Sequence, residues 1–215
     1  VSGFNVLIFF PDDDSTHSIW KIKDRKLTNT ISAYFQTVEC LYIADGHHRA
    51  ASASRIQKTR FENNPGHNGD ESYNYFLATI FPHDEVQIMG YNRIVKDLGG
   101  LTEEQFFDAL RSKFDIHRLN DQEAPKERFT FTMYLDQKWY SLRVKREIIT
   151  EDSVRGLDAS ILQEHVLSPI LNIRDPRTDN RIDFIGGIRG LDELERRCEL
   201  DAKIAFALYP VSIND

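Results

Sequence analysis

The chain has 215 residues, of which 40 % are hydrophobic and 28 % are charged, a composition typical of a globular protein with a proper core. No apolar run approaches the roughly 18 residues that a membrane span requires, so a membrane protein is excluded. The formal net charge of −7 argues against a broad nucleic-acid-binding surface, although a local basic patch stays open.

The cysteines and the chain ends bear on location and completeness. Cys40 and Cys198 are widely separated and lack metal-type spacing, which favours buried free thiols in a reducing cytoplasm. The chain opens at Val1 without an initiator Met or a signal-peptide pattern, and it stops just beyond a strand-like run. We therefore expect a cytoplasmic protein of which this chain is a piece, so that a site in it can be incomplete.

The first predicted elements are two strands, a helix and a third strand. The apolar run 4–10 predicts a buried strand, and residues 17–22 predict a return strand after a turn rich in aspartate. Residues 27–38 predict a helix, and the short apolar run 41–44 predicts a second buried strand.

The pentapeptide Asp45-Gly46-His47-His48-Arg49 follows that second strand and opens an Ala/Ser-rich helix, which we expect to pack closely through Ala50, Ala53 and Ser54. A glycine turn at a helix start leaves backbone N–H groups unpaired, and the terminus carries roughly half a positive charge. Such a site suits phosphate. The alternative is that Asp45 only caps the helix while the histidines and the arginine are solvated.

A polar loop over 62–71 precedes two predicted strands, 73–81 and 86–95. Arg93 and Lys96 lie near the end of the second one. They could reach a phosphate, although a solvated edge is the expected role.

The remaining chain carries clearer signals. Thr102 followed by Gln105 forms a capping-box sequence, with Phe106, Leu110 and Phe114 at helical spacing after it. Alternating apolar residues over 129–135 and 140–144 predict a hairpin. Further elements are expected as a helix capped by Asp158, a strand over 181–185, a helix over 191–198 and a strand over 203–209. Because strands and helices do not alternate as βαβ units, the α+β class is favoured, with regions 1–100 and 101–215 packed on each other.

A second glycine-rich turn covers residues 186–190. Gly187 and Arg189 are candidate phosphate contacts there, although the run is neither a Walker A loop nor a dinucleotide fingerprint. A tight strand-to-helix turn explains the glycines equally well. The arginines and aspartates of residues 175–183 are expected to form an ion-pair network.

Four sequence blocks carry a family resemblance: residues 42–50, 91–98, 175–191 and 205–210. Together they resemble a family of uncharacterised bacterial proteins that share a domain of unknown function. The members of that family are longer, which implies that an N-terminal region and a short C-terminal segment are absent here.

That family is similar to the free-serine kinases, which share the Asp-Gly-His-His-Arg motif, and more distantly to the ParB and sulfiredoxin superfamily. The resemblance implies a ParB/sulfiredoxin-like core around residues 41–57. It implies phosphate contacts at Gly46, His47, His48 and Arg49, with Asp45 and His48 as catalytic candidates. Sulfiredoxin has its reactive cysteine where this chain has His47, which disfavours sulfinic-acid reduction. The kinases also use an upstream acidic residue, whose equivalent here is not identified.

The expected function is therefore a nucleotide-dependent small-molecule kinase acting on free serine or a similar hydroxyl compound. ATP or ADP is the expected donor, and Mg²⁺ enters with the nucleotide because it needs only one carboxylate besides the phosphates. One alternative is a ParB-like nucleotide-binding switch without metabolite kinase activity. Another is a metal-dependent phosphohydrolase, suggested by a superficial similarity of Asp45, His47 and His48 to Asp-His-His phosphoesterases. The acceptor and the oligomeric state stay open.

Overall fold

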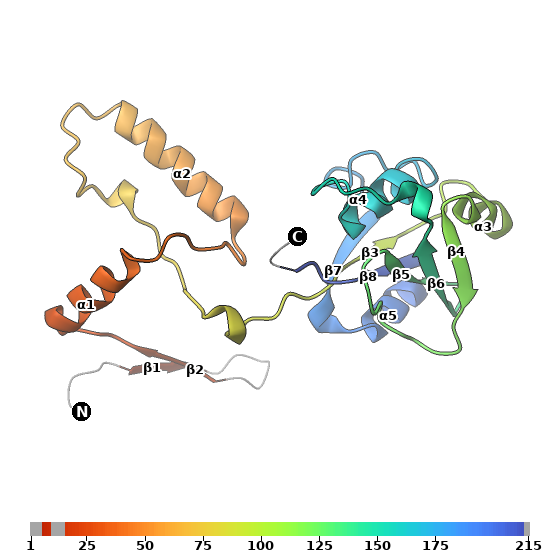
Figure 1. Ribbon diagram of the computed structural model, residues 1–215, viewed down its shortest axis with the longest axis horizontal. Helices are drawn as coiled ribbons and strands as arrows, with labels where there is room; N and C mark the ends of the chain where they lie inside the picture. The colour runs from red at the N-terminus through yellow and green to blue at the C-terminus, as the bar shows by residue number, and fades with distance from the viewer. Residues whose placement is uncertain (1–5, 10–15, 213–215) are drawn as a thin grey trace. The chain divides into compact units, whose positions relative to one another are not determined.

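The computed structural model describes residues 6–9 and 16–212 (Figure 1). Its contacts divide the chain into two units, residues 1–80 and 81–215. The sequence prediction placed this division near residue 100, whereas the strand over 91–95 pairs with strands of the second unit.

The first unit contains a hairpin and two helices. Strands β1 (Val6–Phe9) and β2 (His17–Trp20) pair antiparallel, with Val6 opposite Trp20. The sequence predicted both strands, and residues 4, 5 and 10 of the first prediction lie outside the described residues. Helix α1 (Arg25–Phe35) is capped by Asp24, whose Oδ1 accepts from the Lys26 N–H at 2.8 Å. Helix α2 (His47–Glu62) follows, and a short 3₁₀ turn, η1 (Ser72–Asn74), lies near the end of the unit.

Two strands predicted in this unit are wrong. Residues 40–44 have no regular structure, and Tyr42 is 73 % exposed. Residues 73–81 form part of η1 and then irregular chain. A strand is stable only when a neighbour accepts and donates its backbone hydrogen bonds, and neither segment pairs with any described strand. Local apolar character therefore misled the prediction.

The close packing predicted for α2 is also wrong. None of its residues is buried; Ala50 and Ala53 are half-buried, and Ser54 is exposed.

The second unit is built on a six-stranded antiparallel sheet in the order β4-β6-β5-β8-β3-β7. Its strands are β3 (Tyr91–Val95), β4 (Phe114–Arg118), β5 (Thr130–Leu135), β6 (Lys138–Val144), β7 (Ile182–Gly186) and β8 (Ile204–Leu208). Its α-helices are α3 (Glu103–Arg111), α4 (Asp158–Leu162) and α5 (Asp192–Leu200), and α4 continues as a π-helical turn, η4 (Gln163–Leu167). Its 3₁₀ turns are η2 (His83–Glu85), η3 (Arg146–Ile148) and η5 (Gly187–Arg189). The α+β class is confirmed.

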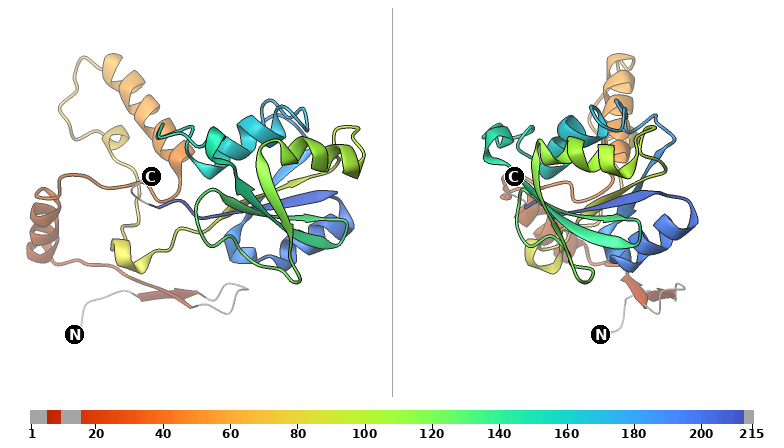
Figure 2. Two further views of the ribbon diagram at one scale, coloured as in Figure 1. Left: turned by 45° about the vertical axis from the view of Figure 1, so that its right-hand side comes forward. Right: turned by 90° about the vertical axis from the view of Figure 1, so that its right-hand side faces the viewer.

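The sheet has a core on each face. Helices α3 and α4 cover one face and α5 covers the other (Figure 2). Successive side chains of β8 lie on opposite faces of the sheet and contribute to both cores. Phe206 belongs to the larger cluster with Phe131, and Ala205 belongs to the smaller cluster with Leu194. All four side chains are fully buried.

Local chemistry in this unit mostly follows the sequence. The capping box is present, because the Gln105 N–H donates to Thr102 Oγ1 at 3.2 Å and the Thr102 N–H donates to Gln105 Oε1 at 3.0 Å. The β5–β6 turn places Asp136 and Gln137 at φ 50° and 55°, as tight hairpins require.

Two local predictions fail. Asp158 is not a helix cap, because it is the first residue of α4 and its Oδ1 accepts from the Phe129 N–H at 2.9 Å. Phe114 begins β4 rather than continuing the helix, where it pairs with Val144 of β6.

Candidate functional site

The turn at the start of α2 has the backbone of an anion site. Gly46 is the N-cap residue, with φ 82°, and no side chain caps the helix. The first helical hydrogen bond runs from the Ala50 N–H to the Gly46 carbonyl at 2.9 Å. Because the first N–H groups of a helix have no partner within it, those of His47, His48 and Arg49 are available to an acceptor.

The charges around this turn also favour an anion. The first turn of α2 contains no acidic residue, and it presents His47, His48 and Arg49. The carboxylate of Asp45 lies 3.4 Å from Arg49 Nη2, and these side chains are 93 % and 83 % exposed. An exposed pair at this distance contributes little to stability, so Arg49 can exchange its partner for a phosphate.

The capping role considered for Asp45 is wrong, because Gly46 takes the N-cap position. A Cβ at Gly46 would lie 3.2 Å from Arg49 Nη2, and the left-handed φ is costly for other residues. Glycine therefore lets the arginine fold back over the turn.

This turn lies on the surface of the described part of the first unit. Asp45, His47, His48 and Arg49 are all exposed, and Gly46 is half-buried. The sequence pattern identified the turn but not its exposure, because exposure depends on which segments cover it.

The second glycine turn lies in the other unit. The Gly187 N–H donates to the Gly90 carbonyl at 2.8 Å, and a Cβ at Gly187 would lie 2.7 Å from that oxygen. The glycine therefore serves close approach of two backbone segments. Arg189 lies on η5, and its guanidinium contacts Glu193 at 3.5 Å.

The ion-pair network predicted near residues 175–183 is present. Arg177 pairs with Asp175 at 2.9 Å and Arg181 with Asp179 at 2.9 Å. Arg181 also contacts Asp97 at 3.3 Å, which ties this loop to the end of β3.

A feature that the sequence analysis missed is a pocket around Arg93. Arg93 lies within β3, between β7 and β8, and not on the solvated edge that the sequence suggested. Its guanidinium carbon lies 5.4 Å from the centre of the Phe184 ring and 5.6 Å from that of Tyr91. Burial is the main cause that lowers the pKa of Arg93 to about 10.

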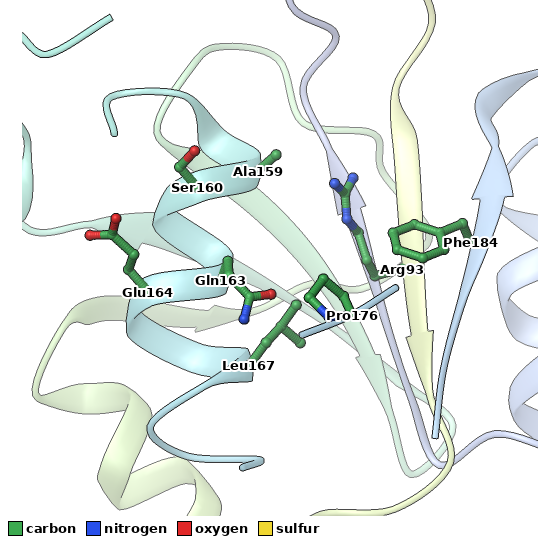
Figure 3. A pocket seen from close by; sticks show the side chains of 8 residues that line it. All are labelled: Arg93, Ala159, Ser160, Gln163, Glu164, Leu167, Pro176 and Phe184. Atoms are coloured by element: carbon green, nitrogen blue, oxygen red, sulfur yellow. The ribbon is translucent and has the colours of Figure 1, made fainter. Parts of the chain in front are cut away.

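The pocket has a volume of about 220 Å³. Figure 3 shows Arg93 beside the Phe184 ring, with Ala159 and Gln163 across the pocket. The lining is mixed, with apolar and polar side chains from α4, η4, β3, β7 and a loop: Arg93, Ala159, Ser160, Gln163, Glu164, Leu167, Pro176 and Phe184. Gln163 Nε2 donates to the Ile173 carbonyl at 2.8 Å.

One sequence signal could have found this pocket. Arg93 shares a strand face with Val95, two positions on, which is buried in the larger core. A charged residue on the same strand face as a core residue is expected to be half-buried rather than solvated.

Comparison with known protein families shows to which family the chain belongs. The model of a family described as "Protein of unknown function (DUF1015)" matches residues 5–160. The chain belongs to this family. No curated protein and no solved structure matches the chain.

The described part of this DUF1015 chain lacks two features. Across residues 6–9 and 16–212, no helix is long and apolar enough to cross a membrane. In the same residues, no group of three or more His, Cys, Asp or Glu side chains is placed to hold a metal ion.

Proposed function

We propose that this protein is a nucleotide-dependent kinase that phosphorylates free serine or a similar small hydroxyl compound. One observation carries the proposal: α2 begins, uncapped, at a left-handed glycine and presents two histidines and an arginine in its first turn. The resemblance of this motif to that of the free-serine kinases supports the same reading.

In this proposal the turn holds the nucleotide phosphates. The N–H groups of His47, His48 and Arg49 donate to phosphate oxygens, and the helix terminus adds its partial positive charge. Arg49 contributes a planar fork that binds two oxygens at once, and Gly46 allows the backbone to approach closely. The histidine rings are further donors.

Asp45 and His48 are the proposed catalytic residues. Phosphoryl transfer depends on positioning and charge neutralisation more than on covalent chemistry. Asp45 would orient the acceptor hydroxyl and take its proton, a contribution of about 10²–10⁴-fold for a well-placed base. The donor is ATP or ADP. A Mg²⁺ brought by the nucleotide fits this site, since it needs one carboxylate besides the phosphates.

The proposal also includes the type of core around the turn and the cellular location of the protein. The turn and helix of residues 45–57 correspond to the phosphate-binding part of a ParB/sulfiredoxin-like core. The free cysteines Cys40 and Cys198 fit a cytoplasmic protein.

The test is a coupled kinase assay of the full-length protein with serine and related hydroxy compounds. Asp45→Asn should lower turnover at least about 10²-fold, the lower end for a lost general base. Folding should be unaffected, because the Asp45 side chain is 93 % exposed. Asp70→Asn, an exposed aspartate of the same unit, is the matched control and should retain wild-type turnover.

Equal rates for wild type and Asp45→Asn would remove Asp45 from the mechanism. Tight nucleotide binding without turnover on any acceptor would instead favour the nucleotide-binding switch. Phosphate release without an acceptor would favour a phosphohydrolase.

A further inference from the structure

We propose that the pocket around Arg93 in the second unit binds a small organic monocarboxylate, with its carboxylate on the guanidinium of Arg93 and a short apolar tail against the pocket wall. The proposal does not depend on the Asp45–Arg49 turn of the first unit or on the proposed kinase activity.

The guanidinium of Arg93 is incompletely paired. A guanidinium has five N–H donors, and the hydrogen bond found for Arg93 goes from Nη1 to the Tyr91 carbonyl. Among the described residues, no carboxylate forms an ion pair with Arg93. A half-buried cation without an anion is costly.

The aromatic rings beside Arg93 offset the cost of burying its charge only partly. Tyr91 and Phe184 stack on each other with ring centres 5.3 Å apart, and the guanidinium lies near both. Such contacts stabilise a cation but leave its in-plane donors unused. Burial lowers the pKa of Arg93 to about 10, so the side chain remains charged at neutral pH and still attracts an anion.

The charges of the pocket favour a carboxylate with a single negative charge. One planar guanidinium matches one carboxylate through two parallel hydrogen bonds. Glu164 also lines the pocket, and its pairing with Arg155 at 3.0 Å lowers its pKa and keeps it ionised. A phosphate dianion carries a second negative charge, and the described residues that line the pocket include no second Lys or Arg to pair with it.

The rest of the pocket lining suits a short, mostly apolar ligand. Ala159, Leu167, Pro176 and Phe184 provide apolar surface, and Ser160 adds a polar group. The volume of about 220 Å³ is well above the roughly 10–15 Å³ that one water needs. A short aliphatic acid, with or without a hydroxyl, fits this lining, and propionate and lactate are suitable probes.

The experiment is an NMR titration of the whole chain, ¹⁵N-labelled, with sodium propionate and sodium lactate up to about 20 mM, a range suited to very small ligands. Saturable shifts are expected at the Arg93 Nε–H and at the backbone amides of residues 159–164 and 184. Sodium phosphate and sodium chloride, at matched ionic strength, should give no saturable shift there.

Three variants test the assignment. Arg93→Met should weaken propionate binding at least about tenfold, as expected when a charge-assisted hydrogen bond is lost. Ser160→Phe retains Arg93 but fills the pocket, and it should also abolish binding. Arg143→Gln, which changes an exposed arginine paired with Glu127 on the same sheet, is the control and should bind as wild type.

Circular dichroism of each variant establishes that it is folded. Should Arg93→Met fail to fold, Ser160→Phe decides the outcome. Absence of saturable shifts with both acids, unchanged binding in the filled pocket, or tighter binding of phosphate than of propionate would each overturn the proposal.

Discussion

The two units of this protein differ in how much they bury. In residues 16–80 no side chain is buried, and Leu77 is 98 % exposed. In the second unit Phe131 and Phe206 have no exposed surface, and the sheet has a core on each face. Burial of apolar surface is the main term that offsets the conformational entropy lost on folding. The second unit therefore has its own source of stability, and the first does not within the described residues.

This difference matters for function. The proposed phosphate site lies in the unit without a core, and its geometry rests on a glycine turn and one helix terminus. The Arg93 pocket lies against the sheet of the unit with a core. Substitutions in the first unit should therefore change ligand binding more than stability, whereas core substitutions in the second should change stability.

The largest expected effect comes from a matched pair of phenylalanines. Phe131→Ala removes a fully buried ring and should lower the free energy of unfolding by about 3–5 kcal/mol. Phe76→Ala removes a ring that is 64 % exposed and should change it by less than about 0.5 kcal/mol. Urea denaturation followed by circular dichroism measures both values. Similar losses for the two variants would show that the first unit has a core of its own.

Thiol labelling compares the units through their cysteines. Cys40 is exposed, and Cys198 is partly buried, which raises its pKa to about 12. Because the thiolate is the reactive form, Cys198 should react with iodoacetamide at pH 8 at least about 10²-fold more slowly than Cys40. Mass spectrometry of timed samples gives both rates, and denaturing urea should make them similar. Fast labelling of Cys198 in the native protein would contradict the partial burial of this side chain.

The smallest expected effect is a pH dependence within the second unit. Hydrogen bonds from Arg196, with a contribution from Arg189, lower the pKa of Glu193 to about 2. A folded pKa below the unfolded one stabilises the protein above pH about 4.5. This contribution is lost as the pH falls through about 2. Urea midpoints of Glu193→Gln should thus lie below those of wild type at pH 6, and the difference should shrink towards pH 3.

The exposed Glu199 of the same helix provides the control for this measurement. Glu199→Gln should follow the wild-type pH profile. A constant difference between Glu193→Gln and wild type from pH 6 to pH 3 would remove Glu193 from the pH dependence.

Sequence patterns predicted the second unit well because its signals are local or strictly periodic. The Thr102–Gln105 capping box and the alternation of β5 and β6 each specify one structure. The strand predicted at 41–44 failed because an apolar run does not reveal whether a pairing partner exists. The turn at Gly46 was found because the run Asp45–Arg49 follows an apolar segment and opens an Ala/Ser-rich helix. The burial of Arg93 was missed because it depends on Phe184, which lies far away in sequence.

The central claim is that the turn at the start of α2 holds a nucleotide phosphate, and calorimetry with ATP and Mg²⁺ tests it most directly. Arg49→Ala should weaken binding by about 1.5–3 kcal/mol, the range for a charge-assisted hydrogen bond. Arg55→Ala, which removes an exposed arginine further along α2, should bind as wild type. Wild-type affinity in a folded Arg49→Ala protein would contradict the claim.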